Sequence, residues 1–128
     1  MSYQDLTKDT FQDALNQDGT IVIDFWAPWC GPCQQFGPTF EAAAEKHSDI
    51  KFFKVNTDEE QEISQALKIR SIPTLMVFRD RILLFSQPGA LAPAQFEELL
   101  TKVKEVNMDE VRAEIAAQEQ PQGGDQQA

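Results

Sequence analysis

Residues 21–33 have the sequence Ile21-Val22-Ile23-Asp24-Phe25-Trp26-Ala27-Pro28-Trp29-Cys30-Gly31-Pro32-Cys33, an apolar run that ends in the only two cysteines of the chain. The first seven of these residues are mainly β-branched and aromatic, and they predict a buried strand. Residues 34–46 then carry Phe and Ala at helical spacing, which predicts a helix. The two cysteines therefore lie at a junction from strand to helix, which is a natural place for a functional site.

The spacing of Cys30 and Cys33 has a direct chemical meaning. Residues three apart lie on one face of a helical turn, about 5–6 Å apart between their Cβ atoms, and a small adjustment then allows a disulfide. Cys30 is expected at the helix N-terminus, where unpaired N–H groups and the helix dipole stabilise a thiolate. Pro32 suits a first turn because its missing N–H would have no helical partner there, and Gly31 leaves little bulk beside the sulfur. Cys30 is therefore the expected nucleophile.

Composition and charge narrow the class of protein. A length of 128 residues with 41% hydrophobic residues suits one packed domain. A formal net charge of -10 argues against nucleic acids and anionic membranes as partners, and no apolar run approaches the roughly 20 residues of a transmembrane helix. Residues 1–8 lack the basic and apolar regions of a signal peptide, so a cytoplasmic location is expected. In such a reducing compartment a lone Cys pair is more often catalytic than structural.

Strand and helix patterns alternate along the rest of the chain. Strands are predicted at 3–6, 51–56, 75–78 and 82–85, the last two joined as a hairpin by Arg79-Asp80-Arg81. Further helices are predicted around Phe11, with Thr7 or Asp9 as cap and an end near Asp18-Gly19, and from Pro93 to Val106. Another is predicted with an acidic start at 57–60 and with Ile63, Ala66 and Leu67 inward. Early strand–helix–strand units imply parallel pairing with helices on both faces of the sheet, whereas the hairpin adds antiparallel strands.

An acidic segment follows this pattern. A capping pair, Asn107 and Glu110, precedes a thin apolar stripe and predicts a short helix to about residue 119, which packs on the domain or continues the last helix. The final residues, 121–128, are rich in Gln and Gly and are expected to be disordered. The chain thus divides into a domain, 1–106, and a C-terminal extension, 107–128.

The segment Trp29-Cys30-Gly31-Pro32-Cys33 resembles the active-site signature of the thioredoxin family, and Pro38, five residues beyond the second cysteine, also fits the family pattern. The resemblance covers residues 1–106. It implies an α/β thioredoxin fold, with a central mixed five-stranded sheet flanked by helices on both faces. It also implies a protein disulfide reductase, in which the Cys30 thiolate attacks a substrate disulfide and Cys33 resolves the mixed disulfide.

The resemblance carries expectations about cofactors and partners as well. It implies no bound cofactor, with the redox-active disulfide Cys30–Cys33 as the working group. Electrons are expected from an NADPH-dependent thioredoxin reductase, the substrates are proteins that contain disulfides, and the protein is expected to be a monomer. No metal site is expected, because two cysteines and one distant histidine, His47, are too few for a closed zinc site. A metal bridging two molecules is the alternative.

Asp24 and Lys54 form the expected proton-transfer pair. Asp24 is an acid inside a strand of Ile, Val, Phe and Trp, and a buried carboxylate is costly unless it is paired or protonated. The resemblance implies that Asp24 lies beneath the second cysteine, with a raised pKa, and exchanges protons with it. Lys54, on the neighbouring strand, matches the lysine that adjoins this acid. The alternative is that Asp24 faces water at the end of its strand.

A substrate-binding rim is implied by the same resemblance. Its expected members are Trp29, Gly31, Pro32, Ile72, Pro73 and Gly89. Pro73 is expected to be cis, which presents the backbone of Ile72 to an incoming peptide as if to an added strand. Trp29 is expected to cover the thiolate and contact substrate, whereas Trp26 is expected to be a core aromatic. A simple turn glycine is the alternative for Gly89.

Three positions depart from the family pattern. Gln34 replaces a common lysine after the second cysteine, Asp80-Arg81 replaces a common Asn-Gly turn, and Ser71 stands where Gly is frequent. None of them touches the reaction itself, although Gln34 could alter the choice of partner.

Two other functions stay open on the sequence alone. The first is a thiol oxidant or isomerase, against which the Gly31-Pro32 dipeptide argues. The second is a redox-independent binding or chaperone-like adaptor that uses the groove and the extension.

Overall fold

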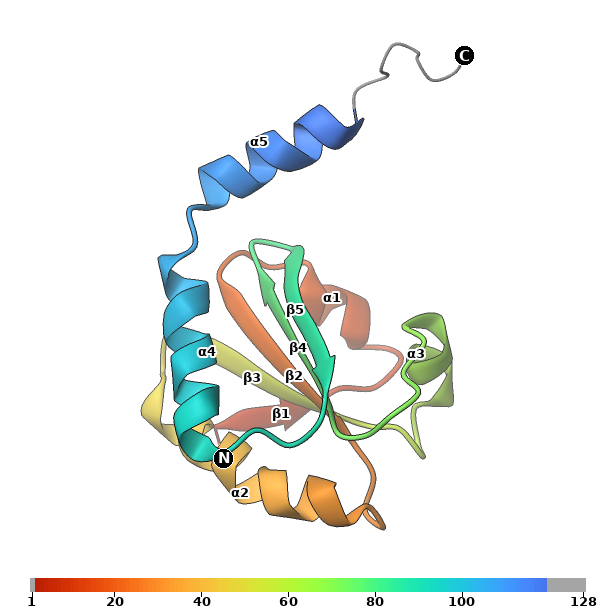
Figure 1. Cartoon of the computed structure of the whole chain (residues 1–128). Helices are drawn as coiled ribbons and strands as arrows, with labels where there is room; N and C mark the ends of the chain where they lie inside the picture. Colours follow the sequence, from red (N-terminus) through yellow and green to blue (C-terminus); the bar gives the residue numbers. More distant parts are fainter. Residues whose placement is uncertain (1, 120–128) are drawn as a thin grey trace.

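The structure is a computed structural model that describes residues 2–119. Five strands and five helices occupy these residues in the order β1 (Tyr3–Asp5), α1 (Phe11–Leu15), β2 (Thr20–Trp26), α2 (Gly31–Lys46), β3 (Ile50–Asn56), α3 (Gln61–Ala66), β4 (Thr74–Arg79), β5 (Ile82–Pro88), α4 (Pro93–Glu105) and α5 (Met108–Glu119). Figure 1 shows the sheet in the middle, with α2 and α4 on one side and α1 and α3 on the other. None of the described helices is long and apolar enough to cross a membrane. The predicted disordered segment 121–128 lies outside the described residues.

The five strands form one mixed sheet in the order β1-β3-β2-β4-β5. The strands β1, β3 and β2 are parallel, whereas β4 pairs antiparallel with β2 and with β5. The register places Asp24 of β2 opposite Lys54 of β3 and opposite Leu75 of β4. This is the predicted thioredoxin fold, with β2 in the centre of the sheet.

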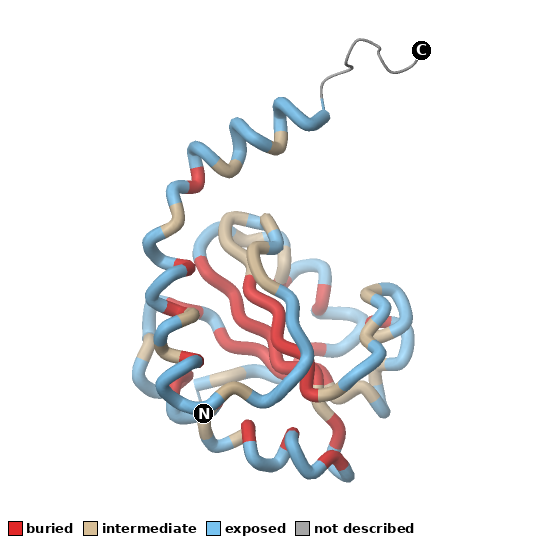
Figure 2. The backbone as a smooth tube through the Cα atoms, in the orientation of Figure 1, coloured by how far each residue is buried: buried red, intermediate tan, exposed pale blue. Residues whose placement is uncertain are grey.

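Two apolar cores lie on the two faces of the sheet, because side chains alternate along each strand. On β2, Val22 packs with Phe36 and Phe40 of α2 and Phe96 of α4. Its neighbours Ile21 and Ile23 belong to the opposite core, beneath α1 and α3. Figure 2 shows this burial concentrated in the central strands and the inner sides of the helices. By the same alternation Asp24 shares the face of Val22, which is the face that α2 covers.

Several details differ from the sequence predictions. The helix α1 ends at Leu15, earlier than predicted, and begins after Thr10, which makes no side-chain cap bond. In α3 only Ile63 is buried, whereas Ala66 is exposed because the helix ends there and the chain turns away. The helix α5 continues to Glu119, the last described residue, and Asn107 Oδ1 accepts the N–H of Glu110 at 3.1 Å, a capping bond between the two residues of the predicted pair.

Candidate active site

The Cys pair occupies the first turn of α2. Cys30 is the N-cap residue, and its Sγ accepts the backbone N–H of Cys33 at 3.2 Å. The backbone of Cys30 is extended, as an N-cap requires, and Gly31 and Pro32 form the start of the helix. A disulfide joins the two sulfurs, with their Cα atoms 5.2 Å apart. An N–H donor and the helix N-terminus thus act on the same sulfur and favour its thiolate after reduction.

Apolar groups surround both cysteines. Each cysteine is only 4% exposed, and Ala27, Trp26 and Ile72 pack against the pair. The Ile72–Pro73 peptide bond is cis, as predicted. The carbonyl oxygen of Ile72 lies 3.6 Å from Cys30 Sγ, so the backbone before Pro73 borders the expected nucleophile.

Gly89 adjoins the same cis turn. Its N–H donates to the carbonyl of Pro73 at 2.8 Å, and its φ of +113° lies in the region that favours glycine. A Cβ at Gly89 would meet nothing within 4 Å, and the same holds for Gly31. The backbone conformation, rather than crowding within the chain, is therefore what favours glycine at 89.

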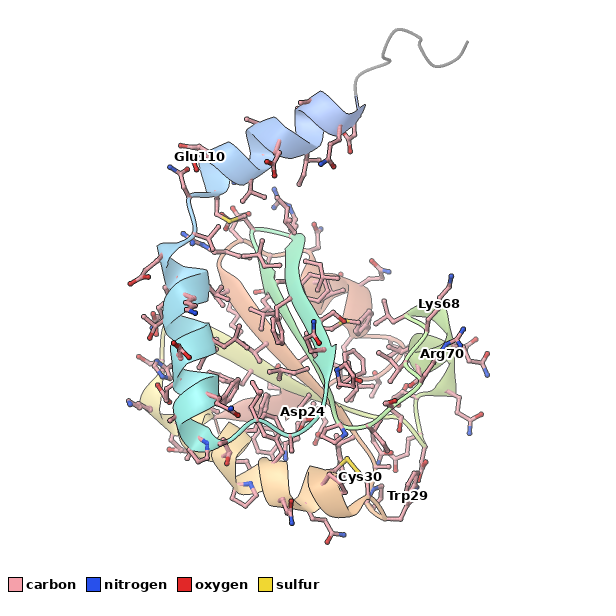
Figure 3. All side chains as sticks on the ribbon, viewed as in Figure 1. Asp24, Trp29, Cys30, Lys68, Arg70 and Glu110 are labelled. Atoms are coloured by element: carbon pink, nitrogen blue, oxygen red, sulfur yellow. A yellow bond between two sulfur atoms is a disulfide. The ribbon has the colours of Figure 1, made fainter. Side chains whose placement is uncertain are left out.

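Trp29, which directly precedes Cys30, is largely exposed. The residue is 69% exposed, and its indole N–H donates to Asp58 Oδ2 at 2.9 Å. The partly buried side chains that pack against the cysteines are those of Trp26 and Ile72, and the cover of the thiolate by Trp29 stays a prediction. An exposed indole held by a carboxylate presents a fixed apolar surface at the rim (Figure 3).

Asp24 is buried, which excludes the alternative that it faces water. It is 1% exposed, and no described residue hydrogen-bonds its Oδ1. Burial raises the pKa of Asp24 from 3.8 to about 7, while Lys54 lowers this pKa and Glu41 raises it. An acid with this pKa changes its protonation state near neutral pH, as a proton carrier must.

Lys54 has a different ion-pair partner from the one that its position suggests. It is the register neighbour of Asp24, but its Nζ donates to Glu41 Oε2 at 2.7 Å. The same Nζ lies 4.5 Å from the ring centroid of Tyr3, within range of a cation–π contact. Lys54 therefore acts on Asp24 through space, with Glu41 and Tyr3 holding its ammonium.

Sequence reasoning missed two polar residues around the site, Asp58 and Glu41, and the contact that a third, Gln34, makes. Asp58 lies in an acidic run that is typical of a solvated helix start, yet it holds the indole of Trp29. No sequence pattern indicated a role for Glu41, because its contact with Lys54 depends on how α2 packs on β3. Gln34, noted as the loss of a lysine, donates from Nε2 to the carbonyl of Pro28 at 2.8 Å and so ties the loop before Cys30 to the helix.

His47 lies far from the Cys pair in sequence and has its own partners. Its Nε2 is 2.8 Å from Glu97 Oε1, and its Nδ1 is 3.4 Å from Lys104 Nζ. Within residues 2–119 no three His, Cys, Asp or Glu side chains are grouped so as to hold a metal ion.

A Cys-x-x-Cys disulfide at a helix N-terminus, beside a cis-proline and with a buried acid on the preceding strand, defines the class of thiol–disulfide oxidoreductases with the thioredoxin fold. Comparison with known proteins agrees. The thioredoxin family model matches residues 2–104. A "Putative thioredoxin 2" of Streptomyces coelicolor is 44% identical over 119 residues, which cover 93% of this chain and 89% of that protein.

Two further relatives match over most of their own length. The thioredoxin of Porphyra purpurea is 41% identical over 104 residues, which cover 80% of this chain and 97% of that protein. The solved thioredoxin of Malassezia sympodialis superimposes with a TM-score of 0.71 at 34% identity, over 78% of this chain and 89% of that one. The chain belongs to the thioredoxin family. It is a protein-disulfide oxidoreductase that works by dithiol–disulfide exchange through Cys30 and Cys33.

Proposed function

We propose that this protein is a cytoplasmic reductant of protein disulfides, recycled by an NADPH-dependent thioredoxin reductase. The observation that carries the proposal is the N–H of Cys33 directed at Cys30 Sγ at the start of α2. Stabilisation of the Cys30 thiolate makes this sulfur the attacking group at neutral pH.

The proposed reaction has two exchange steps. The Cys30 thiolate attacks one sulfur of a substrate disulfide, forms a mixed disulfide and releases the other substrate sulfur as a thiolate. Asp24, as carboxylate, then takes the proton of Cys33, directly or through water. The Cys33 thiolate attacks Cys30 Sγ, which forms the Cys30–Cys33 disulfide and releases the second substrate thiolate. Two electrons have then passed to the substrate, and thioredoxin reductase supplies two further electrons, from NADPH, to reduce the Cys30–Cys33 disulfide again.

The rim residues have proposed roles in substrate binding. The backbone of Ile72, exposed by cis-Pro73, pairs with an extended segment of the substrate. Trp29, Gly31, Pro32 and Gly89 border this segment and leave room for it. Lys54 tunes the protonation of Asp24.

The direction of electron flow is tested by the reduction potential of Cys30–Cys33 against a glutathione buffer. A potential near -270 mV, about that of thioredoxin, is expected for a reductant. A potential between roughly -180 and -120 mV would contradict the proposal, because this is the range of isomerases and strong oxidants.

The order of attack is tested by two substitutions. Cys33→Ser is expected to accumulate mixed disulfides with substrate, because Cys30 still attacks but nothing resolves the product. Cys30→Ser is expected to abolish turnover and to trap nothing. Both are measured by non-reducing electrophoresis and by thiol release from a disulfide-linked reporter peptide. Trapping by Cys30→Ser instead of Cys33→Ser would reverse the two roles.

A further inference from the structure

The electrostatic surroundings of Asp24 contain one group without a role in the proposed reaction. A hollow of about 510 Å³ opens beside the second cysteine, with Cys33 and Glu41 of α2, Tyr3 and Asp5 of β1, Trp26 and Lys54 along its wall. Asp24 lies behind this wall, two residues before Trp26 and beside Lys54 in the sheet. Of the titratable groups that line this hollow, Lys54 and Glu41 act electrostatically on Asp24, and Cys33, Tyr3 and Asp5 complete the set.

The Lys54 ammonium is the critical charge in this group. Its side chain is only 10% exposed, so its position is fixed by contacts rather than by water. A direct ion pair with Asp24 would keep that carboxyl ionised through neutral pH, and such a carboxyl would no longer exchange protons there. The ammonium instead donates to Glu41 Oε2 at 2.7 Å, and Asp24 Oδ1 is left without a partner among the described residues.

Glu41 is well placed for this contact. It lies on α2 eight residues after Cys33, and its side chain is 48% exposed, at the open side of the hollow. From this position the Glu41 carboxylate reaches the Lys54 ammonium, and the pair that they form has no net charge.

We propose that Glu41 is a positioning residue for the exchange reaction: its carboxylate holds the Lys54 ammonium at the open side of the hollow, and Asp24 stays unpaired and able to carry the Cys33 proton. This proposal rests on the proposed role of Asp24. Removing the Glu41 charge would leave the ammonium uncompensated beside Asp24, which favours the ionised carboxylate.

The test is the titration of Asp24 in the oxidised full-length protein, followed by NMR of its carboxyl carbon. Glu41→Gln is expected to lower the Asp24 midpoint by about 0.5–1 in pH, and Glu41→Asp is expected to restore most of the parent value. The matched control is Glu45→Gln, which removes a carboxylate one turn further along α2, where it is bonded to Ser2 Oγ rather than to Lys54. A merely structural Glu41 would lower stability and leave the midpoint in place.

A double-variant cycle shows whether Glu41 acts through Lys54. Lys54→Met is expected to raise the Asp24 midpoint, and Glu41→Gln made in that background is expected to produce less than half of its shift in the parent. A full shift without Lys54 would overturn the proposal, because Glu41 would then act on Asp24 as a charge by itself. An unmoved midpoint in Glu41→Gln would overturn it as well.

The pH–rate profile of reporter reduction separates this proposal from the proposed function. In Glu41→Gln the lower midpoint of the rate is expected to move with the NMR midpoint of Asp24. If Asp24→Asn leaves the rate and its profile unchanged, the assigned role of Asp24 fails. If Asp24→Asn flattens the profile while Glu41→Gln does not move it, only the role of Glu41 fails.

Discussion

Asp24 serves the proposed proton transfer but lowers the stability of the fold, because a carboxylate without a partner is costly in an apolar interior. Burial raises its pKa to about 7 in the folded protein, against 3.8 for an unperturbed Asp side chain. Between about pH 4 and pH 7 the unfolded chain has therefore released this proton while the folded protein keeps it. The free energy of unfolding falls as pH rises through this window, by an amount that approaches about 4 kcal/mol.

Asp24→Asn is expected to remove this pH dependence. At pH 8 the variant should be more stable than the parent by about 2–4 kcal/mol, and near pH 4.5 the two should differ by no more than about 1 kcal/mol, since the folded carboxyl is then protonated and the unfolded one has only just passed its own pKa. Urea unfolding of the oxidised proteins across pH 4.5–8 measures both differences. Glu59→Gln, which neutralises an exposed acid, serves as the control for net charge. If the difference in free energy of unfolding between Asp24→Asn and the parent is the same at pH 4.5 and at pH 8, the raised pKa is contradicted.

At this scale the sequence identified some side chains and missed others. Asp24 was recognisable because an acid among Ile, Val and Phe in a strand needs a reason to be there. Cys30, Cys33 and Pro73 followed from local spacing and family resemblance, and the cis bond before Pro73 is confirmed. Glu41 and Asp58 were not recognisable, since their contacts join helices or loops to residues 13 and 29 positions away in the sequence.

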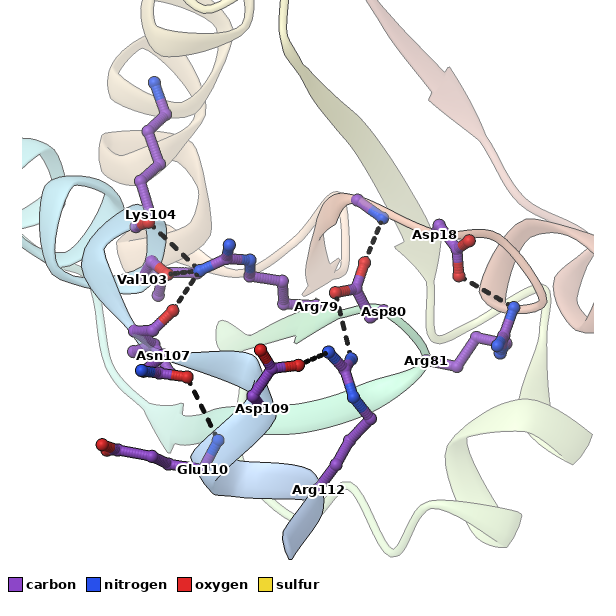
Figure 4. Close-up of polar contacts among 12 residues, drawn as sticks. Asp18, Arg79, Asp80, Arg81, Val103, Lys104, Asn107, Asp109, Glu110 and Arg112 are labelled. Atoms are coloured by element: carbon purple, nitrogen blue, oxygen red, sulfur yellow. Dashed lines mark hydrogen bonds and ion pairs between the residues drawn. The ribbon is translucent and has the colours of Figure 1, made fainter.

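Three charged residues with positive φ, Lys68, Asp80 and Arg81, lie in the turns that connect the helices and strands. Asp80 and Arg81 form the two-residue turn between β4 and β5, where both central residues of a tight hairpin turn need positive φ. Asp80 exchanges hydrogen bonds with Gly19, by its N–H at 3.0 Å and its Oδ1 at 2.8 Å, and Arg81 pairs with Asp18 at 2.9 Å. These contacts (Figure 4) offset the cost of a turn without glycine.

Lys68 has no comparable contact. It follows α3, and the N–H groups of Lys68 and Ile69 donate to Gln65 and Ser64, as in the Schellman ending that favours glycine at this position. Among the described hydrogen bonds and ion pairs, none involves its side chain. Lys68→Gly is therefore expected to raise the free energy of unfolding by about 0.5–1 kcal/mol, because relief of the left-handed conformation exceeds the added freedom of the unfolded chain.

Chemical unfolding of Lys68→Gly and Asp80→Gly compares a turn residue whose side chain makes no described hydrogen bond or ion pair with one whose side chain makes both. Asp80→Gly relieves the same kind of backbone cost but loses the bond from the Gly19 N–H to the Asp80 carboxylate and the ion pair with Arg112, so it is expected to gain nothing or to destabilise. Equal stabilisation by both substitutions would show that the hairpin contacts contribute no stability.

Most elements could be predicted because their signals are local. The central strand, the helix after the cysteines and the order of strands and helices follow from apolar periodicity and turn residues. The early end of α1 and the exposure of Ala66 could not be predicted in this way, because in short helices tertiary packing decides how far the helix continues.

At the scale of the whole molecule, the Cys pair and the extension occupy opposite ends. Figure 3 shows Asp24, Cys30 and Trp29 at one end and Glu110 of α5 at the other. The end of α4 is held independently of α5, since Arg79 Nη1 donates to the carbonyls of Val103, Lys104 and Val106 at 2.7–3.1 Å. The extension itself adds a buried Met108 and the ion pair from Arg112 to Asp80 at 3.5 Å.

Removal of residues 107–128 is therefore expected to lower the stability of the protein and to leave its exchange rate nearly unchanged. Loss of the buried Met108 should lower the free energy of unfolding by about 1.5–3 kcal/mol, while the exposed ion pair contributes less than about 1 kcal/mol. The exchange rate should stay within about twofold of the parent, because Cys30, Cys33 and Asp24 keep all of their contacts. Met108→Ala and a deletion of residues 120–128 serve as controls for the apolar contact and for the end of the chain.

Thiol release and urea unfolding measure the two properties separately, and substrate trapping with Cys33→Ser adds a third. A large loss of exchange rate in a folded truncated protein would contradict the separation of the two ends. If the truncated protein keeps its exchange rate but Cys33→Ser no longer traps its targets, the extension binds partners. The adaptor function would then operate alongside the oxidoreductase function, at the end of the sheet that the chemistry does not use.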